Sequence, residues 1–467
     1  MLMPDFLHSI LSRPIAVIGL GKSHTPLLEF LCAQGARHMT ARDRRPFEQL
    51  PPAVQAFRAR GVSFRCGEDY LADLVEPTLF RTPGLRPDTP PLAEARARGA
   101  MVLGECDLVL RLCPAETYAI TGSDGKTTTT TLVSRLLAAA GQATCTGGNI
   151  GASLLPLLPG LTASDAAVLE LSSFQLMDME GSADHAAWIN LTENHLNWHR
   201  DMAEYAAAKR RILAAPHCVL NADDKTTAAE IPLHPDVTLF SVSQTAEALQ
   251  KQYPMAASVT ITDGEFLLTE RKNSRRLCPL SASLLPGLHN RANLAAALAL
   301  TCRRIGRGDA IEALRGFCGV EHRMEQVCLR RGVRYINSSI DSTPARTAAT
   351  LAALAPDRPL VIAGGADKGL SFEGLADTLI DRAAAVFLTG DTAGQIYHAL
   401  ISNKQYNPTR LPVSVYPDLA GALHAAAELA RPGDTVVLSP ACTSFDRFRD
   451  FEERGQLFRE LVRALPD

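Results

Sequence analysis

Short apolar runs alternate with longer, helix-like stretches along almost the whole chain. Six of these runs have the length and composition of buried strands, at positions 15–19, 119–122, 167–171, 360–364, 386–390 and 435–439. Strands that alternate with helices in this way are typical of βα units and parallel sheets. Most of the runs end at glycine or at a small polar residue, and α/β proteins bind ligands at the carboxyl ends of their strands. The pattern therefore predicts an α/β fold whose sites lie beyond these strand ends.

The chain has 467 residues, more than one hydrophobic core usually supports, which predicts several domains. Three α/β domains account for the pattern most simply, with breaks within 103–116 and 316–322. The first domain, 1–107, and the last, 320–467, are expected to be Rossmann-like. The middle domain, 108–319, is expected to contain a parallel sheet like that of P-loop ATPases.

Composition narrows the class of protein. Apolar residues make up 46% of the chain and the net charge is −3, which argues against binding of nucleic acid or of anionic membranes. The chain has no uncharged apolar run of about 18 residues, so no transmembrane helix is predicted. Residues 1–20 lack the basic start and cleavage site of a signal peptide and are interpreted as a first strand. Eleven dispersed cysteines without a C-x-x-C pair fit a reducing cytoplasm and argue against a zinc site.

The first apolar run leads into the segment G-L-G-K-S-H at 19–24. A dinucleotide-binding fingerprint would have a third glycine at the position of His24. Asp43 follows the second predicted strand, about where an acidic residue binds a ribose hydroxyl in such folds. A lone G-x-G motif is weak evidence. It is compatible with NAD, with another nucleotide-like ligand, and with a turn that is purely structural.

The strongest motif is I-T-G-S-D-G-K-T at 120–127, which is followed by a helical pattern. A strand that ends in a glycine turn before a helix presents free backbone N–H groups and the positive end of the helix dipole to phosphate oxygens. Lys126 adds a positive charge for the outer phosphates, and the Thr127 hydroxyl is well placed for Mg²⁺. The full P-loop pattern would have glycine in place of Ile120, so this is a shorter version. The motif predicts a site for a nucleoside triphosphate.

Three further residues extend this hypothesis. Glu170 lies in an otherwise apolar strand, where a carboxylate is costly unless it is paired or bound to a metal ion. His195 follows the strand-like run 186–191, and Lys209 ends the helical segment 201–209. Each has an ordinary alternative: a buried ion pair for Glu170, a hydrogen-bonded loop histidine for His195, and a solvated helix lysine for Lys209. Their joint occurrence after a phosphate loop favours a metal–ATP site.

Eight sequence blocks, in order, resemble the Mur ligase family along nearly the whole chain. Two of them, E-L-S-S-F-Q-L and S-P-A-C-T-S-F, point to the branch that adds D-glutamate, and the D-N-P-R signature of the branch that adds diaminopimelate or lysine is absent. The blocks are T-P-G-L-R-P-D-T-P-P (82–91), T-G-S-D-G-K-T-T (121–128), G-G-N-I-G (147–151), E-L-S-S-F-Q-L (170–176), G-L-H-N-R-A-N (287–293), E-H-R-M-E (321–325), S-P-A-C-T-S-F-D-R-F (439–448) and F-E-E-R-G (451–455).

The resemblance implies a monomeric, cytoplasmic amide ligase that joins D-glutamate to UDP-N-acetylmuramoyl-L-alanine in peptidoglycan synthesis. ATP would convert the substrate carboxylate to an acyl phosphate, which the amine of D-glutamate attacks. The first domain would bind the uridine-diphosphate substrate, the middle one MgATP, and the last one the amino acid.

The resemblance also implies a role for individual positions. The substrate residues would be Lys22, Ser23, Asp43, Arg44, Arg45, Gly84 and Asn149. The ATP residues would be Gly122, Ser123, Asp124, Gly125, Lys126, Thr127, Thr128, Asn293, Arg323 and Ser338, and D-glutamate would contact Lys368, Ser444 and Phe451. Lys126, Glu170, His195 and Lys209 would be catalytic. Thr127 with Glu170 would bind one Mg²⁺, and His195 with a carbamylated Lys209 would bind a second.

One segment departs from the family pattern. The family usually has Asn-Asp-Ser where this chain has N-S-S at 337–339, so Ser338 replaces an acidic residue, and Ile340 stands where lysine is frequent. The hypothesis is altered ATP affinity, with Asp341 as the candidate substitute. Three alternatives stay open: a Mur-type ligase for another amino acid, a phosphate-loop kinase or hydrolase, and a non-catalytic nucleotide-binding paralogue.

Overall fold

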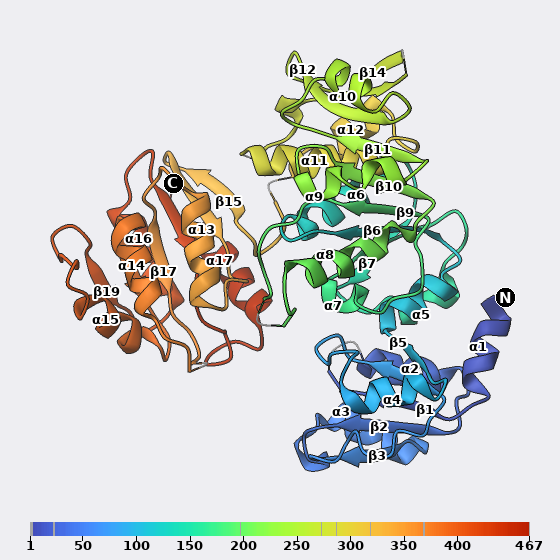
Figure 1. Ribbon diagram of the computed structural model, residues 1–467. Coiled ribbons are helices and arrows are strands. Elements are labelled where there is room, and N and C mark those ends of the chain that lie inside the picture. The colour runs from blue at the N-terminus through green and yellow to red at the C-terminus, as the bar shows by residue number, and fades with distance from the viewer. Residues whose placement is uncertain are drawn as a thin grey trace. The chain divides into compact units, whose positions relative to one another are not determined.

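The computed structural model describes residues 3–21, 24–196, 198–271, 273–285, 287–317, 319–367 and 369–466. The chain divides into two compact units, Met1–Phe317 and Cys318–Asp467. Figure 1 shows the elements of both units, coloured from the N-terminus to the C-terminus. Three sheets form their frameworks, two in the first unit and one in the second.

The first sheet has five parallel strands in the order β3-β2-β1-β4-β5. The order reverses at β1, so the loops that follow β1 and β4 leave the sheet next to each other at the place where such folds bind ligands. Its strands are β1 Ile15–Ile18, β2 Met39–Asp43, β3 Ser63–Cys66, β4 Thr78–Arg81 and β5 Met101–Leu103, and its helices are α1 Met3–Leu11, α2 His24–Ala33, α3 Pro52–Gln55 and α4 Pro90–Ala97.

Helix α1 corrects one sequence-based interpretation. Residues 1–20 were expected to form a first strand, but a helix occupies 3–11 and the strand begins at Ile15. Phe6 and Ile10 are buried one helical turn apart, so an amphipathic helix covers the core before the strand starts.

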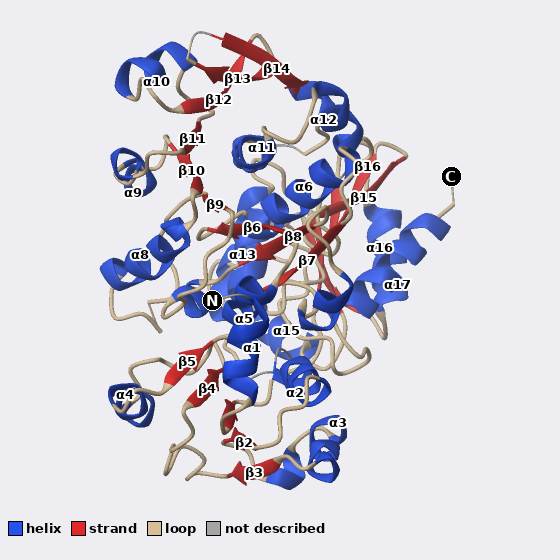
Figure 2. Ribbon diagram, turned by 90° about the vertical axis from the view of Figure 1, so that its right-hand side faces the viewer, coloured by secondary structure: helices blue, strands red, loops and turns tan. Residues whose placement is uncertain are grey.

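The central sheet has nine strands in the order β14-β13-β12-β11-β10-β9-β6-β8-β7. The pairs from β7 to β12 are parallel, and β13 and β14 extend the sheet as antiparallel strands. Figure 2 shows β12, β13 and β14 together at the end of this sheet, near α10 and α12. The strands are β6 Glu116–Thr121, β7 Thr144–Gly148, β8 Ala166–Glu170, β9 His185–Trp188, β10 His217–Asn221, β11 Val237–Phe240, β12 Ala257–Thr262, β13 Glu265–Glu270 and β14 Asn273–Pro279.

Two cores cover the faces of the central sheet. Helices α6 and α11 pack against each other on one face, where the alanines of α11 allow close approach to Leu132 and Leu136. The other face shares one apolar cluster with the first sheet, through α5 between them. The helices are α5 Glu105–Leu112, α6 Lys126–Ala139, α7 Ser173–Leu176, α8 Met202–Arg210, α9 Lys225–Ala228, α10 Ala246–Gln252, α11 Leu288–Thr301 and α12 Arg307–Leu314.

The second unit contains a six-stranded sheet in the order β15-β16-β20-β17-β18-β19, in which only β15 is antiparallel. Helices α13 to α15 contribute to the core on one face, and α16 and α17 contribute to the core on the other. The elements are β15 Glu325–Arg330, β16 Val333–Asn337, α13 Pro344–Ala353, β17 Leu360–Ala363, α14 Glu373–Arg382, β18 Ala385–Leu388, α15 Ala393–Ile401, β19 Val413–Val415, α16 Leu419–Leu429, β20 Thr435–Leu438 and α17 Phe451–Ala464.

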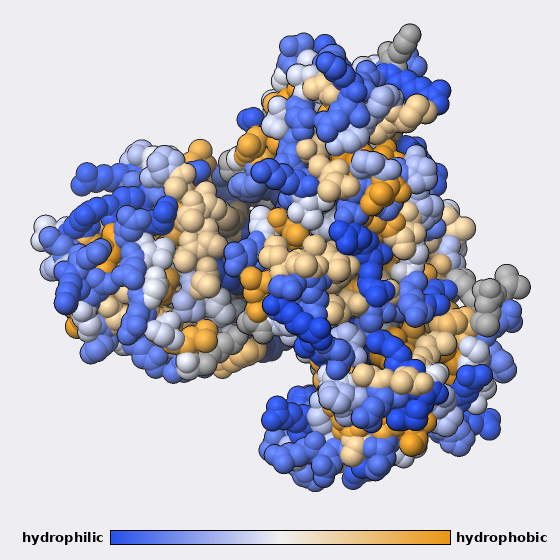
Figure 3. Space-filling view, viewed as in Figure 1, coloured by the Kyte–Doolittle hydropathy of each residue, from blue (hydrophilic) through white to orange (hydrophobic). Residues whose placement is uncertain are grey.

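The predicted fold class is confirmed: all six predicted strands form, and three mostly parallel α/β sheets result. The ten described cysteines are free thiols. Among the described residues, no helix is long and apolar enough to cross a membrane. On the face drawn in Figure 3, hydrophilic residues are spread over both units and hydrophobic residues occur in small separate groups.

Candidate active site

The turn between β6 and α6 is fixed by backbone geometry and by one asparagine. Gly125 has a φ of 77°, and a Cβ atom there would lie 2.1 Å from Oδ1 of Asn293, so the position requires glycine. The side-chain oxygen of Asn190 accepts hydrogen bonds from the backbone N–H groups of Ser123 and Asp124 at 2.8 and 3.0 Å. The turn therefore has one defined shape at the start of a 14-residue helix.

Lys126 and Glu170 both lie at this helix start. Lys126 Nζ donates to the carbonyl oxygens of Gly122 and Ser123 at 3.0 and 2.9 Å. Glu170 ends β8, is 1% exposed, and accepts hydrogen bonds from Thr127 Oγ1 at 2.7 Å and Asn149 Nδ2 at 2.8 Å. Both of these donors are neutral, so they hold the carboxylate in place without cancelling its charge. The arrangement suits a cation bound beside the turn.

Lys209 is buried, which excludes the alternative of a solvated helix lysine. Its side chain is on α8, and Nζ donates to the carbonyl of Gly122 at 2.7 Å and to Thr121 Oγ1 at 3.3 Å. Burial, together with the nearby charge of Lys126, holds the pKa of Lys209 well below its usual value. A buried amine with a low pKa has a larger neutral fraction, and the neutral amine is the form that reacts with carbon dioxide.

His195 lies in the segment between β9 and α8 with a φ of 57°. Its ring centroid is 5.0 Å from that of Phe174 and 6.2 Å from that of Tyr205. Desolvation and the charges of Lys126 and Lys209 lower the pKa of His195, which favours the neutral imidazole that binds metal ions. The structure thus brings Lys126, Glu170, Lys209 and His195 to one region of the central sheet, around the turn after β6.

Other predicted ATP residues divide between the two units. Asn293 is buried on α11 with its side chain against Gly125, and Thr128 lies in the first turn of α6. Arg323 is exposed in the second unit. Ser338 has no exposed surface, and its Oγ accepts a hydrogen bond from the backbone N–H of Met324 at 3.2 Å. The ATP roles of Arg323 and Ser338 stay predictions.

The predicted substrate residues that the structure describes in the first sheet lie at the end of β2 and in the loops after β2 and β4. Asp43 accepts from the backbone N–H of Leu20 at 2.7 Å and from Arg45 Nε at 2.9 Å, so its carboxylate already has protein partners. Arg44 is exposed next to it. The carbonyl of Gly84 accepts from Trp198 Nε1 at 3.1 Å, which connects this loop to the central sheet. Lys22 and Ser23 lie outside the described residues.

The predicted D-glutamate residues belong to the second unit. Ser444 is buried after β20, and Phe451 begins α17, where its carbonyl accepts from Ser339 Oγ at 2.8 Å. Lys368 lies outside the described residues. Asp341, the candidate substitute for an acidic residue at 338, is 5% exposed and accepts from the hydroxyls of Thr350 and Ser439, each at 2.7 Å.

Sequence reasoning missed two residues that shape the phosphate loop. Asn190 fixes the turn, and the signal was a polar residue within the strand-like run 186–191, two residues after the end of β9. Tyr205 lies 3.1 Å from Ser123 Oγ through its hydroxyl, one helical turn before Lys209. That spacing places Tyr205 and Lys209 on one face of α8.

The chain is similar to known proteins along its whole length. Residues 120–301 match the family described as Mur ligase middle domain, and residues 322–442 match the one described as Mur ligase, glutamate ligase domain. A Clostridium tetani protein named UDP-N-acetylmuramoylalanine–D-glutamate ligase is 38% identical over 99% of each chain. The Symbiobacterium thermophilum protein of the same name is 39% identical, over 97% of this chain and 99% of its own.

Solved structures share the fold. UDP-N-acetylmuramate-alanine ligase from Thermotoga maritima superposes with a TM-score of 0.52 at 17% identity, covering 97% of this chain and 99% of its own. A UDP-N-acetylmuramoyl-L-alanyl-D-glutamate–2,6-diaminopimelate ligase gives a TM-score of 0.54 at 19% identity, covering 83% and 93%. At these identities the likeness concerns the fold alone.

Proposed function

Because the chain belongs to the Mur ligase family, we propose that it is the ATP-dependent ligase that joins D-glutamate to UDP-N-acetylmuramoyl-L-alanine in peptidoglycan synthesis. The observation that carries the nucleotide half of this function is the buried carboxylate of Glu170, hydrogen-bonded to Thr127 at the helix start beside Lys126. The identity of the two joined substrates rests on the full-length similarity to relatives that bear this name.

The reaction needs two steps because a carboxylate is a poor acyl donor. In the first step the γ-phosphoryl group of ATP moves to the carboxylate of the sugar-nucleotide substrate, which gives an acyl phosphate and ADP. In the second step the amine of D-glutamate attacks the acyl carbon, an amide bond forms, and phosphate leaves. Lys126 and the backbone N–H groups at the start of α6 are suited to neutralise the transferring phosphoryl group.

The residues present fit magnesium. Thr127 and Glu170 would provide oxygen ligands for one ion, and Asn149 holds the carboxylate in its orientation through a hydrogen bond. A second ion requires an anion near His195, which Lys209 provides if its neutral amine takes up carbon dioxide to form a carbamate. Bound magnesium supplies further neutralisation of phosphate charge during the transfer.

The ligands are assigned to the three sheets as follows. The first sheet, within 1–107, binds the uridine-diphosphate end of the substrate near Asp43, Arg44, Arg45 and Gly84. The central part, 108–319, binds MgATP, and 320–467 binds D-glutamate through Ser444 and Phe451. We place the enzyme in the cytoplasm and expect it to act as a monomer. Its partners are small molecules: ATP and the two substrates.

A two-substrate assay tests the proposed function. Phosphate release from ATP is expected to require both UDP-N-acetylmuramoyl-L-alanine and D-glutamate, with one amide product formed per phosphate. Phosphate release that needs neither substrate would instead identify a nucleotide hydrolase. Absence of turnover with both substrates would favour a non-catalytic paralogue, and turnover with a different amino acid would move the chain to another branch of the family.

A further inference from the structure

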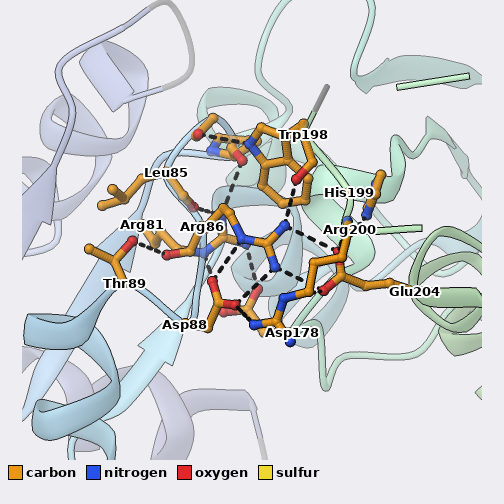
Figure 4. A network of polar contacts seen from close by, with 12 residues as sticks. Arg81, Leu85, Arg86, Asp88, Thr89, Asp178, Trp198, His199, Arg200 and Glu204 are labelled. Atoms are coloured by element: carbon orange, nitrogen blue, oxygen red, sulfur yellow. Dashed lines mark hydrogen bonds and ion pairs between the residues drawn. The ribbon is translucent and has the colours of Figure 1, made fainter. Parts of the chain in front are cut away.

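A network of polar contacts joins the loop 82–88 after β4 to two segments of the central sheet (Figure 4). At its centre lies Arg86, whose side chain is 23% exposed. Its guanidinium forms paired hydrogen bonds with Asp88 at 2.8 and 2.9 Å, and with Glu204 at 2.8 and 3.1 Å. It also donates to the backbone carbonyl of Trp198 at 2.6 Å. One side chain thus binds two carboxylates and a carbonyl, and two of these partners, Trp198 and Glu204, belong to the segment that follows β9 of the central sheet.

Glu204 connects this contact to the proposed catalytic helix. It lies in the first turn of α8, 15% exposed, and also accepts from the backbone N–H of Arg200 at 2.9 Å. The next residue on the helix, Tyr205, reaches Ser123 of the phosphate loop, and Lys209 follows one turn later. Glu204, Tyr205 and Lys209 lie on the same helix, so a displacement of Glu204 also displaces the two residues that face the turn after β6.

A second arginine fixes the other side of the same loop. Arg81, 2% exposed, donates to the carbonyl oxygens of Thr82, Pro83 and Leu85 at 3.1, 3.2 and 2.5 Å. It also donates to the carbonyl of Phe174 at 3.0 Å and pairs with Asp178 at 2.5 Å. Phe174 belongs to the segment that follows Glu170. The loop that contains Gly84 is thus held between the segment after Glu170 and the helix that carries Lys209.

The paired contact between Arg86 and Glu204 fixes an orientation as well as a distance. A guanidinium that bonds a carboxylate through two parallel N–H groups fixes both distance and angle, whereas a lysine ammonium fixes distance alone. The pair is bidentate, largely buried and part of a network, so it can contribute to stability as well as to geometry, and the melting temperature has to be measured beside kcat. The geometry matters for the reaction because alignment of the reacting atoms is sensitive to displacements of about 1 Å.

We propose that Arg86 and Glu204 are positioning residues for the ligation reaction. Their paired contact sets the loop 82–85, which holds the sugar-nucleotide substrate, at a fixed distance from α8 and from the phosphate loop that faces it. The substrate carboxylate is thereby aligned with the phosphoryl group that it receives. This inference rests on the proposed function, since it assigns a role within that reaction.

Arg86→Lys tests the inference because it keeps the charge and removes the two-pronged geometry. We expect kcat to fall about a hundredfold, because a displacement of about 1 Å between reacting groups can have an effect of this size. The KM for ATP should change less than about twofold. Glu204→Gln, which keeps the side-chain shape, is expected to show the same split. Because the two residues share one bidentate contact, the double variant should be slowed by clearly less than the product of the two single effects.

Arg96→Lys is the matched control. Arg96 also pairs across the two sheets, with Asp178 at 2.8 Å, but it is 42% exposed and does not contact α8. It is expected to retain wild-type kcat, and all variants are expected to keep the wild-type melting temperature within the range of the control. If Arg86→Lys has wild-type kcat, or if both substitutions lower kcat and stability alike, the inference is overturned. A wild-type enzyme that forms no product from the two substrates overturns the proposed function, and this inference with it.

Discussion

After β1, and again after β6, a buried strand runs through a glycine turn into a helix, yet the side chains around the two turns differ. Both turns contain a glycine with positive φ, Gly19 at 80° and Gly125 at 77°. In the first turn, the nearby carboxylate of Asp43 already binds Arg45 and a backbone N–H of the turn. In the second, the carboxylate of Glu170 is held by a hydroxyl and an amide.

The partners of the two carboxylates distinguish two kinds of site that share the same strand–turn–helix backbone. A carboxylate neutralised by arginine has little affinity left for a cation, whereas one held by neutral donors keeps its charge for a metal ion. In the second turn, Lys126 donates to the carbonyls of Gly122 and Ser123, and after the first turn the buried His24 begins α2. The neighbouring strands and helices decide the chemistry, and the glycine turn supplies the backbone shape.

The most severe test of the comparison is Lys126→Ala. We expect kcat/KM for the ligation to fall about 10²–10³-fold, the usual loss when one preorganised charge-stabilising group is removed. The measurement is amide formation dependent on ATP and D-glutamate. Lys225→Ala, at an exposed lysine of α9 in the same unit, is the control and should keep wild-type activity. Wild-type speed in Lys126→Ala would contradict the assignment of the second turn.

A smaller effect is expected from adding a methyl group to each turn. Gly125→Ala should destabilise the protein by about 1–3 kcal/mol, because it combines a strained backbone with overlap of Asn293. Gly21→Ala meets nothing within 4 Å and should change stability by no more than about 0.5 kcal/mol. Urea unfolding of the two variants measures the difference. Equal costs at both positions would show that the positive φ and the Asn293 contact at Gly125 add nothing to the cost of the methyl group.

The smallest effect concerns the first turn and depends on pH. Burial lowers the pKa of His24 from 6.5 to about 4, so the folded state resists the proton that the unfolded chain binds below pH 6.5. Stability is therefore lost as the pH falls from 7 toward 4. His24→Leu removes this loss. The free energy of unfolding of the variant, relative to that of wild type, should therefore rise by about 1 kcal/mol when the pH is lowered from 7 to 5.5. Unfolding measured at both pH values gives the change, and a constant difference would argue against a buried neutral ring.

The sequence predicted the parts of the structure whose signal is local. Parallel strands buried on both faces appear as continuous apolar runs, which is why the runs ending near Gly19 and Gly122 were placed correctly. A carboxylate such as Glu170 in an apolar strand is conspicuous for the same reason. The antiparallel strands β13 and β14 were missed, because charged and polar residues such as those at 273–276 interrupt their apolar pattern.

Contacts distant in sequence left no such signal. Arg86 and Glu204 are 118 residues apart, and each alone resembles an ordinary surface charge. Taken alone, Lys209 fitted a solvated helix residue, and only its occurrence together with Glu170 and His195 after the phosphate loop favoured a metal–ATP site. The fold shows that α8 turns it toward that loop. The roles assigned to Arg323, Ser338, Ser444 and Phe451 stay predictions.

The position of helix α5 limits how the protein can be divided into fragments. The expected boundary at 107 and 108 lies inside this helix, and seven of its eight residues are buried. A recombinant fragment that begins at 108 would lose the first turn of α5 and expose apolar surface that normally packs against the first sheet. Such a fragment should aggregate during expression, so the Met1–Phe317 unit is the smallest piece worth purifying from this half of the chain.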